Sequence, residues 1–166
     1  AILIVGNEIL SGRTRDCNAH FLAVALKGIG VTVGRIVVIP DLPHVIADEV
    51  NRLRTSFDYV LACGGIGPTP DDVTRPAVAQ AFGIPCEPHA EAVRILRDYY
   101  GERATPRRMV MAELPRDAEL IPNPRTIALG FRVANVFVLP GIPELVEDMF
   151  PYVAASLQHG TLVEVE

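Results

Sequence analysis

Short apolar runs alternate along the first half of the chain with stretches whose apolar residues recur every three or four positions. The first pattern predicts strands buried on both faces of a sheet, and the second predicts amphipathic helices. The predicted elements are a strand at 1–5, a helix at 18–29, a strand at 31–39, a helix at 43–56 and a strand at 59–63. Because this β-α-β-α-β order requires parallel strands with right-handed crossover helices, we expect a three-layer α/β fold with an open, mostly parallel sheet and helices on both faces.

The second half of the chain has a less regular pattern. Helices are predicted at 74–82, from about 89 to 100, at 106–113 and from 143 to about 157, with a proline-rich loop or irregular strand at 114–124. Thr74 is the expected cap of the first of these helices, and Gly83 is its expected end. Two apolar runs on either side of Ala134-Asn135 predict a small carboxyl-terminal hairpin.

Length and composition favour one domain over residues 1–166. A chain of 166 residues can bury one substantial core but is short for two domains. Its net charge is −5 and its basic residues are scattered, which argues against nucleic acid as a partner. The three cysteines lack the spacing of a disulfide framework or a zinc site, and no apolar segment is long enough to span a membrane. We therefore expect a cytoplasmic protein with no membrane partner.

Polar and glycine-rich residues follow the predicted strands. Residues 6–8 follow the first strand, Asp41 follows the second, the stretch 64–72 follows the third, and Pro140-Gly141 follows a later one. The carboxyl ends of parallel strands meet at one edge of an open sheet, and ligands bind in the crevice there. The sequence therefore predicts a binding site at this edge.

The stretch of residues 64–72 has the composition of a phosphate-binding loop. Three glycines within four residues let the main chain approach a ligand closely and turn its N–H groups toward an anion. The glycines are Gly64, Gly65 and Gly67, and the nearby hydroxyl donors are Thr69 and Thr74. Their spacing matches neither the dinucleotide motif GxGxxG nor a P-loop, so the nucleotide folds that carry those motifs are not indicated.

Two acids, Asp71 and Asp72, follow the glycines. They would repel a bare phosphate, but a phosphate that carries Mg²⁺ or a related ion needs carboxylate oxygens at this point. The combination favours a metal–phosphate ligand, although a glycine turn with a helix-capping aspartate explains the same residues equally well. Asp16 has the same two interpretations, metal ligand or helix cap, and Glu8 is either a ligand contact or a solvated acid.

Five stretches of the chain form a recognisable series of motifs. They are Gly6-Asn7-Glu8-Ile9-Leu10-Ser11-Gly12, Asp16-Cys17-Asn18-Ala19, Gly64-Gly65-Ile66-Gly67-Pro68-Thr69-Pro70-Asp71-Asp72-Val73-Thr74, Pro122-Asn123-Pro124 and Leu139-Pro140-Gly141-Ile142-Pro143. In order and spacing they resemble the molybdopterin-binding (MoaB/Mog-like) domain family. The subgroup with the greatest resemblance is the amino-terminal domain of the competence/damage-inducible protein A (CinA) family.

The resemblance implies a homo-oligomer that binds a phosphate-bearing pterin or nucleotide at the carboxyl edge of its sheet. It makes Asp72 the metal-linked functional acid and Asp16 the earlier functional acid of the family pattern. Our leading hypothesis is that Asp72 holds the metal together with Asp16 or Asp71. The implied ligand contacts are Gly6, Asn7, Glu8, Ser11, Gly64, Gly65, Gly67, Pro68, Thr69, Thr74, Asn123, Pro140 and Gly141. The activity implied by the CinA subgroup is hydrolysis of a nucleotide pyrophosphate such as ADP-ribose with Mg²⁺, Mn²⁺ or Co²⁺.

Two departures from the family pattern keep other functions open. Asn7 stands where an aspartate is common, and residues 125–131 read Arg-Thr-Ile-Ala-Leu-Gly-Phe where the subgroup continues toward Gly-Thr-Ala-Pro-Gly-Phe. One alternative is adenylyl transfer to molybdopterin, which is the activity of the wider family. The other is a non-catalytic domain for ligand binding or oligomerisation, because the altered loop has lost a glycine and a proline.

Overall fold

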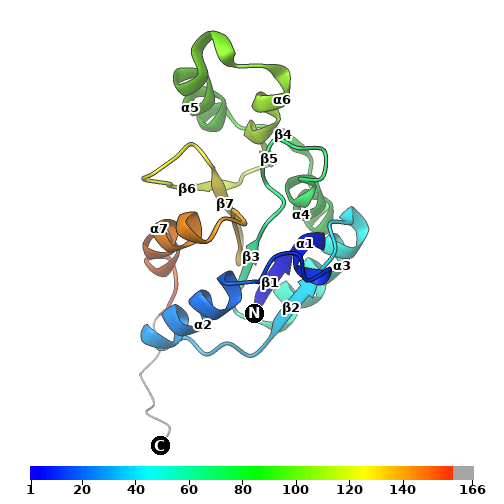
Figure 1. Cartoon of the computed structure of the whole chain (residues 1–166), viewed down its shortest axis with the longest axis vertical. Helices are drawn as coiled ribbons and strands as arrows, with labels where there is room; N and C mark the ends of the chain where they lie inside the picture. The colour runs from blue at the N-terminus through cyan, green and yellow to red at the C-terminus, as the bar shows by residue number, and fades with distance from the viewer. Residues whose placement is uncertain (159–166) are drawn as a thin grey trace, which may run out of the picture.

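The computed structural model of the chain describes residues 1–158 and has a six-stranded sheet with the order β2-β1-β3-β8-β7-β6 (Figure 1). The strands are β1 (Ile2–Val5), β2 (Ile36–Ile39), β3 (Val60–Cys63), β6 (Glu119–Ile121), β7 (Gly130–Val133) and β8 (Val136–Leu139). The first four strands in the sheet order are parallel, and β7 and β6 add antiparallel pairs. The expected mostly parallel α/β fold is confirmed, and the predicted hairpin forms β7 and β8 of this same sheet.

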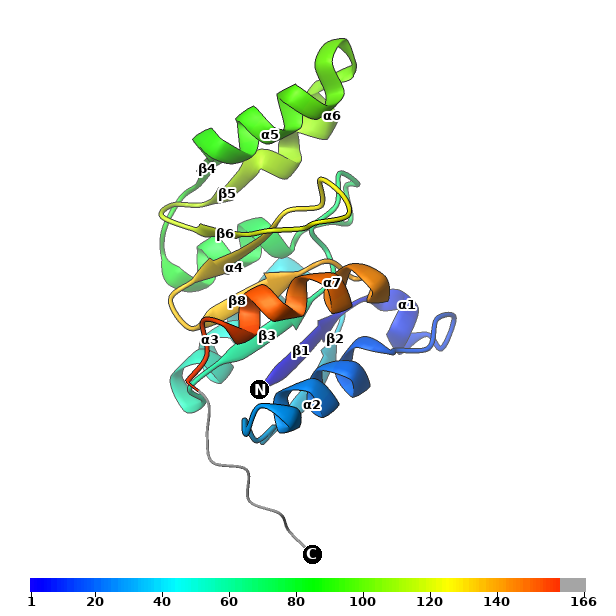
Figure 2. The same ribbon diagram turned by 90° about the vertical axis from the view of Figure 1, so that its left-hand side faces the viewer.

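Helices cover both faces of the sheet. Figure 2 shows α2 (Asn18–Gly28) and α7 (Pro143–Ala154) in front of the strands, while α3 (Pro43–Ser56) and α4 (Thr74–Phe82) lie behind them. The strand side chains alternate between the two layers: Ile2 and Ile4 pack in the core with α2 and α7, and Leu3 and Val5 pack with α3 and α4. Because both faces are buried, β1 and β3 are apolar at every position.

A smaller lobe lies beyond β6 (Figure 2). It contains a two-stranded antiparallel ladder of β4 (Cys86–Pro88) and β5 (Glu113–Pro115), the helices α5 (Ala90–Tyr100) and α6 (Pro106–Met109), and the 3-10 helices Gly101–Arg103 and Val110–Ala112. The ladder was not predicted, because each of its strands has only three residues and contains proline.

The observed elements differ from the predicted ones mainly at their ends. The second strand covers Ile36–Ile39 instead of 31–39, because the four residues of β1 pair only with these four. The last helix ends at Ala154 rather than near residue 157, and the helix predicted at 106–113 divides into α6 and a 3-10 turn. The short helix α1 (Asn7–Leu10) was not predicted. Within residues 1–158, no helix combines the length and apolar character that a membrane crossing requires.

Candidate functional site

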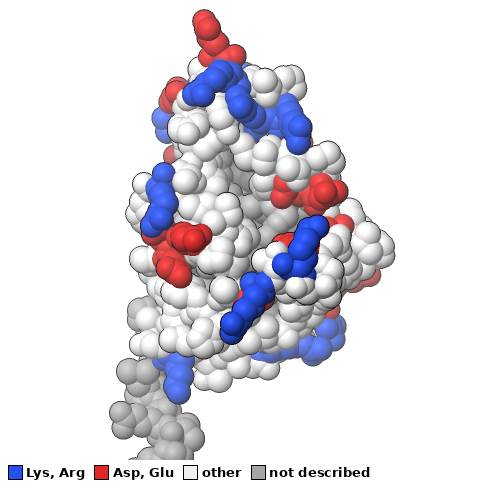
Figure 3. Space-filling view, in the orientation of Figure 1, with Lys and Arg blue, Asp and Glu red and all other residues white. Residues whose placement is uncertain are grey.

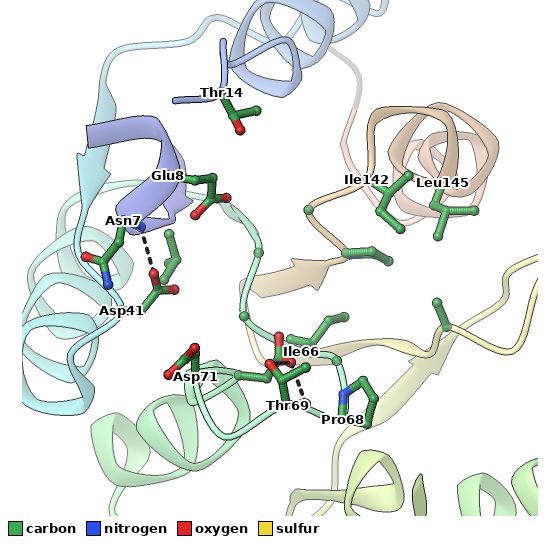
Figure 4. Close-up of a pocket in the computed structure, with 18 of the residues that line it drawn as sticks. Asn7, Glu8, Thr14, Asp41, Ile66, Pro68, Thr69, Asp71, Ile142 and Leu145 are labelled. Atoms are coloured by element: carbon green, nitrogen blue, oxygen red, sulfur yellow. Dashed lines mark hydrogen bonds between the residues drawn. The ribbon is translucent and has the colours of Figure 1, made fainter. Parts of the chain in front are cut away.

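A cavity of about 590 Å³ opens at the carboxyl ends of β1, β3 and β8, at the edge where the sequence places a site. Its lining residues come from the segments that follow the strands: Val5, Asn7, Glu8, Arg13, Thr14, Asp41, Gly64, Gly65, Ile66, Gly67, Pro68, Thr69, Asp71, Asp72, Met111, Ala128, Pro140, Gly141, Ile142 and Leu145. Figure 4 shows Glu8 and Thr14 on one side, Thr69 and Asp71 on another, and Ile142 and Leu145 on a third. The cavity therefore has polar walls and one apolar wall.

We call residues Gly64–Asp72 the phosphate loop. Two of its glycines have left-handed backbone angles, with φ of 105° at Gly64 and 69° at Gly65. A side chain at Gly64 would overlap the backbone carbonyl of Val5, and one at Gly65 would overlap the Thr74 side chain. The loop therefore needs glycine at both positions to pass close to β1 and to the start of α4.

The buried side of the phosphate loop is held by α4. The Thr74 N–H donates to the carbonyl of Gly65 over 3.0 Å, and the Arg75 guanidinium donates to the carbonyls of Ile66 and Gly67, the latter over 2.9 Å. In contrast, the N–H groups of Gly65, Ile66 and Gly67 donate to no acceptor within the described part of the chain. The loop thus keeps three consecutive donors available for a ligand.

Arg75 is a buried cation, with 2% of its surface exposed. Burial lowers the pKa of its guanidinium, and the nearby Asp72 carboxylate opposes this shift. An arginine remains charged at neutral pH in either case. The sequence reasoning missed Arg75, although a signal was present: Arg75 lies three and four residues before Val78 and Ala79, on the buried face of α4.

Four carboxylates surround the free donors. Asp72 accepts hydrogen bonds through Oδ2 from the backbone N–H and the hydroxyl of Thr69, at 2.8 and 2.6 Å. Asp71 is exposed at the rim. Across the cavity, Asp41 accepts from the backbone N–H of Asn7 over 2.7 Å, and Glu8 points into the space between (Figure 4). The carboxylate of Glu8 accepts no hydrogen bond from residues 1–158.

Basic side chains lie further out. Arg13 lines the cavity, and Arg107 of α6 donates from Nε to the Pro68 carbonyl over 3.3 Å. Figure 3 shows a hollow in the middle of this face, with basic atoms above and below it and an acidic group at its side. Four of the charged residues that line the cavity are acidic and only Arg13 of its lining residues is basic, so an anion that enters it meets an excess of acidic side chains.

The acids fit a metal ion that is shared with a ligand. Among the described residues, no three His, Cys, Asp or Glu side chains are grouped closely enough to hold a metal ion by themselves. Mg²⁺ is commonly held by one or two carboxylates together with phosphate oxygens and water. Asp71 and Asp72 supply that number at the end of the phosphate loop, so the donor set suits a metal–phosphate ligand rather than a metal held only by protein.

The structure brings most of the predicted site residues together at the cavity. Those that line it are Asn7, Glu8, Gly64, Gly65, Gly67, Pro68, Thr69, Asp71, Asp72, Pro140 and Gly141. Those that do not are Gly6, Ser11, Asp16, Thr74 and Asn123. The sequence reasoning also did not anticipate the apolar wall of Met111, Ile142 and Leu145, although Ile142 belongs to one of the matched stretches.

Asp16 lies at the start of α2 and not on the cavity wall. Its carboxylate accepts hydrogen bonds from the N–H groups of Asn18 and Ala19, which is the helix-capping geometry. The Ser11 hydroxyl turns away to the Glu8 carbonyl at 3.2 Å, and Gly6 lies behind the Glu8 carboxylate. These three residues therefore do not line the cavity.

Thr74 and Asn123 were also predicted as ligand contacts, and neither lines the cavity. The predicted capping role of Thr74 is wrong: Val73 is the N-cap of α4 without a side-chain bond, and Thr74 Oγ1 is buried under Gly65 with no hydrogen-bond partner among the described residues. Asp72 does not cap α4 either, because its side chain bonds to Thr69. Asn123 borders a separate cavity of about 310 Å³ beside α5.

Comparison with known families confirms the family resemblance that the sequence motifs indicate. The sequence profile of the family described as "Probable molybdopterin binding domain" matches residues 1–159. A protein from Pyrobaculum arsenaticum is 40% identical over 156 residues, which make up 90% of this chain and 59% of that protein. The chain therefore spans about three fifths of the length of this relative.

Solved structures share the same fold. The crystal structure of the protein CinA from Thermoplasma acidophilum has a TM-score of 0.87 and 32% sequence identity, and the match covers 93% of this chain and 96% of that chain. The tungsten cofactor synthesizing protein MoaB from Pyrococcus furiosus has a TM-score of 0.58 and 20% identity, with 93% and 89% of the two chains covered. The second likeness concerns the fold alone.

Proposed function

The chain belongs to the molybdopterin-binding domain family, and on that premise we propose that its cavity binds a phosphate-bearing nucleotide or pterin with a divalent metal ion and hydrolyses a nucleotide pyrophosphate such as ADP-ribose. One observation carries the proposal: three N–H groups of the phosphate loop, with no acceptor among the described residues, belong to residues that line a cavity that also holds four carboxylates. Donors alone would suit an anion, and acids alone would suit a cation. Their combination suits a phosphate that carries a metal ion.

The residues of the chain have separate tasks in this proposal. The N–H groups of Gly65, Ile66 and Gly67 bind the phosphate oxygens and stabilise the charge that grows on them. Asp72 and Asp71 would hold Mg²⁺, Mn²⁺ or Co²⁺, which supplies charge neutralisation and a more acidic water when it is bound. Asp16, which caps α2, would act from outside the cavity by fixing the start of that helix.

Hydrolysis breaks one P–O bond of the anhydride. Water adds to one phosphorus atom, the bridging oxygen leaves with the other phosphate, and ADP-ribose yields AMP and ribose 5-phosphate. The water must lose a proton, and the Glu8 carboxylate, which has no hydrogen-bond partner among residues 1–158, faces the phosphate loop across the cavity, where it can accept that proton. The apolar wall of Met111, Ile142 and Leu145 offers a surface for the base or pterin ring.

Adenylyl transfer to molybdopterin is the second candidate. The same phosphate loop and acids would then bind ATP, and a pterin phosphate would take the place of water as the acceptor. The match to a family described as molybdopterin-binding favours this candidate, whereas the greater similarity to CinA favours hydrolysis. A third candidate, a domain that binds the ligand without reaction, is favoured by the altered loop at 125–131.

A substrate and metal screen tests these candidates. ADP-ribose, FAD, NAD and ATP are incubated with the protein and Mg²⁺, Mn²⁺, Co²⁺ or EDTA, and the products are separated by chromatography. We expect metal-dependent release of AMP from ADP-ribose and no release with EDTA. Adenylylation of a pterin phosphate from ATP would support the second candidate instead. Tight binding of ADP-ribose with no product under any condition would support the third.

Homo-oligomerisation remains a prediction. Several large apolar side chains are exposed, among them Leu10, Val24, Ile36, Leu42 and Tyr99, and a self-complementary interface would cover such residues. Light scattering at micromolar concentration should give a mass above that of one chain. A monomer under those conditions would contradict the prediction.

A further inference from the structure

Four consecutive carbonyl groups of the phosphate loop accept hydrogen bonds from other parts of the chain. They belong to Gly65, Ile66, Gly67 and Pro68. The first is bonded by the backbone N–H of Thr74, the second and third by the guanidinium of Arg75, and the fourth by Nε of Arg107. Arg75 alone therefore binds two of the four, through two different nitrogen atoms.

The direction of each carbonyl fixes the direction of the next N–H group. The described chain has no cis peptide bonds, and the C=O and N–H of a trans peptide point in opposite directions. When Arg75 holds the Ile66 carbonyl toward α4, the Gly67 N–H is turned to the opposite side. The Thr74 N–H does the same for the Ile66 N–H by holding the Gly65 carbonyl. Both N–H groups belong to residues that line the cavity, and Arg75 does not line it.

Burial of the Arg75 guanidinium costs free energy, because the charge loses its contact with water. Its surface is 2% exposed, it forms no ion pair with a carboxylate among the described residues, and carbonyl groups accept its hydrogen bonds. An apolar residue at this place on α4 would avoid the cost of desolvating a charge. The guanidinium also places a positive charge directly behind the loop, where it favours an anion in front of it.

We propose that Arg75 is the positioning residue of the phosphate site: it holds the carbonyls of Ile66 and Gly67 away from the cavity, and its bond to the Ile66 carbonyl turns the Gly67 N–H toward a phosphate. The proposal rests on the proposed function, because it requires a phosphate ligand. It assigns Arg75 no contact with the ligand. The loop without this guanidinium could rotate its peptides and present carbonyl oxygens to the anion.

The test compares Arg75→Lys with a matched control. Lysine keeps the charge, but its single ammonium cannot reproduce the planar fork that binds two neighbouring carbonyls. Arg54→Lys is the control, because Arg54 also donates to a backbone carbonyl, that of Ala81, but lies on α3 away from the cavity. Binding of inorganic pyrophosphate with Mg²⁺ is measured by calorimetry. We expect the dissociation constant to rise at least about tenfold in Arg75→Lys, as for one lost hydrogen bond to a charged group, and to stay within about twofold in the control.

Amide resonances give a readout that a merely structural role would not move. In the parent protein, pyrophosphate with Mg²⁺ should shift the ¹⁵N–¹H resonance of Gly67, and this shift should shrink in Arg75→Lys while its melting curve remains cooperative. Parental affinity and parental shifts in that variant would overturn the role of Arg75 and leave the proposed function standing. If Arg75→Lys does not fold, the parent protein provides the test. A Gly67 amide resonance that does not shift when pyrophosphate binds overturns the proposal. A parent that binds no pyrophosphate overturns both.

Discussion

The phosphate loop and the loop of residues 122–129 between β6 and β7 are braced in different ways. The phosphate loop is held from outside by a buried helix, through the Thr74 backbone and the Arg75 side chain. The 122–129 loop is held mainly by its own side chains: Asn123 accepts from the N–H groups of Arg125 and Thr126 and donates to the Ala128 carbonyl. Only Ala128 of this loop lines the main cavity. The shape of the phosphate loop therefore depends on α4, whereas the shape of the 122–129 loop depends mainly on its own residues.

The largest expected effect comes from Gly64→Ala, which attacks the bracing of the phosphate loop. The φ of 105° at Gly64 is unfavourable for alanine, and the new methyl group would overlap the Val5 carbonyl. We expect the free energy of unfolding to fall by about 3 kcal/mol or more in urea denaturation. Gly28→Ala is the control, because Gly28 ends α2 with open space around it and should gain up to about 1 kcal/mol. Equal stability of the two variants would show that Gly64 is not constrained.

Removal of the metal ion should have the next largest effect. Without a divalent cation, the carboxylates of Glu8, Asp41, Asp71 and Asp72 face the phosphates directly. We expect the affinity for ADP-ribose in EDTA to be at least about tenfold lower than with Mg²⁺, equivalent to roughly 1.4 kcal/mol. Calorimetric titration measures both. The same affinity with and without the metal would mean that the N–H groups alone hold the ligand.

Asn123→Ala disrupts the bracing of the 122–129 loop and should have a smaller effect than the two changes above. The variant loses the side-chain bonds that brace residues 122–129, so we expect a stability loss of about 1 kcal/mol. Affinity for ADP-ribose with Mg²⁺ should change less than about threefold, because Asn123 borders the separate cavity beside α5. A tenfold loss of affinity would instead restore Asn123 to the ligand site, as the family resemblance implies.

Much of the fold could be predicted because the apolar runs and helical periodicities are strong. Helices α3 and α4 have the predicted bounds, and the parallel order follows from the alternation of strands and helices. The short ladder of β4 and β5 could not be predicted, because strands of three residues with proline carry no periodic signal. The length of β2 is set by its partner β1, which is a tertiary constraint rather than a property of residues 31–39.

The position of the site could be predicted better than the tasks of its residues. Strand-end residues such as Asn7, Gly64 and Pro140 gather at one edge because parallel strands end together. Whether an acid points into the cavity or caps a helix depends on its side-chain direction, so Asp16 and Asp72 could not be distinguished from the sequence. Arg75 was missed because a buried charge is an exception to the apolar pattern, and its acceptors are backbone atoms that no motif reveals.

The most direct test of the metal–phosphate site is the turnover of Asp72→Asn. Its amide oxygen can still accept the hydrogen bond from Thr69, so the melting temperature should stay near that of the parent protein. If Asp72 holds the metal, metal-dependent hydrolysis of ADP-ribose should fall about 100-fold or more, equivalent to roughly 3 kcal/mol of transition-state stabilisation. Asp48→Asn, which removes one exposed charge on α3, should keep parental turnover. Near-parental turnover of a folded Asp72→Asn would contradict the metal site.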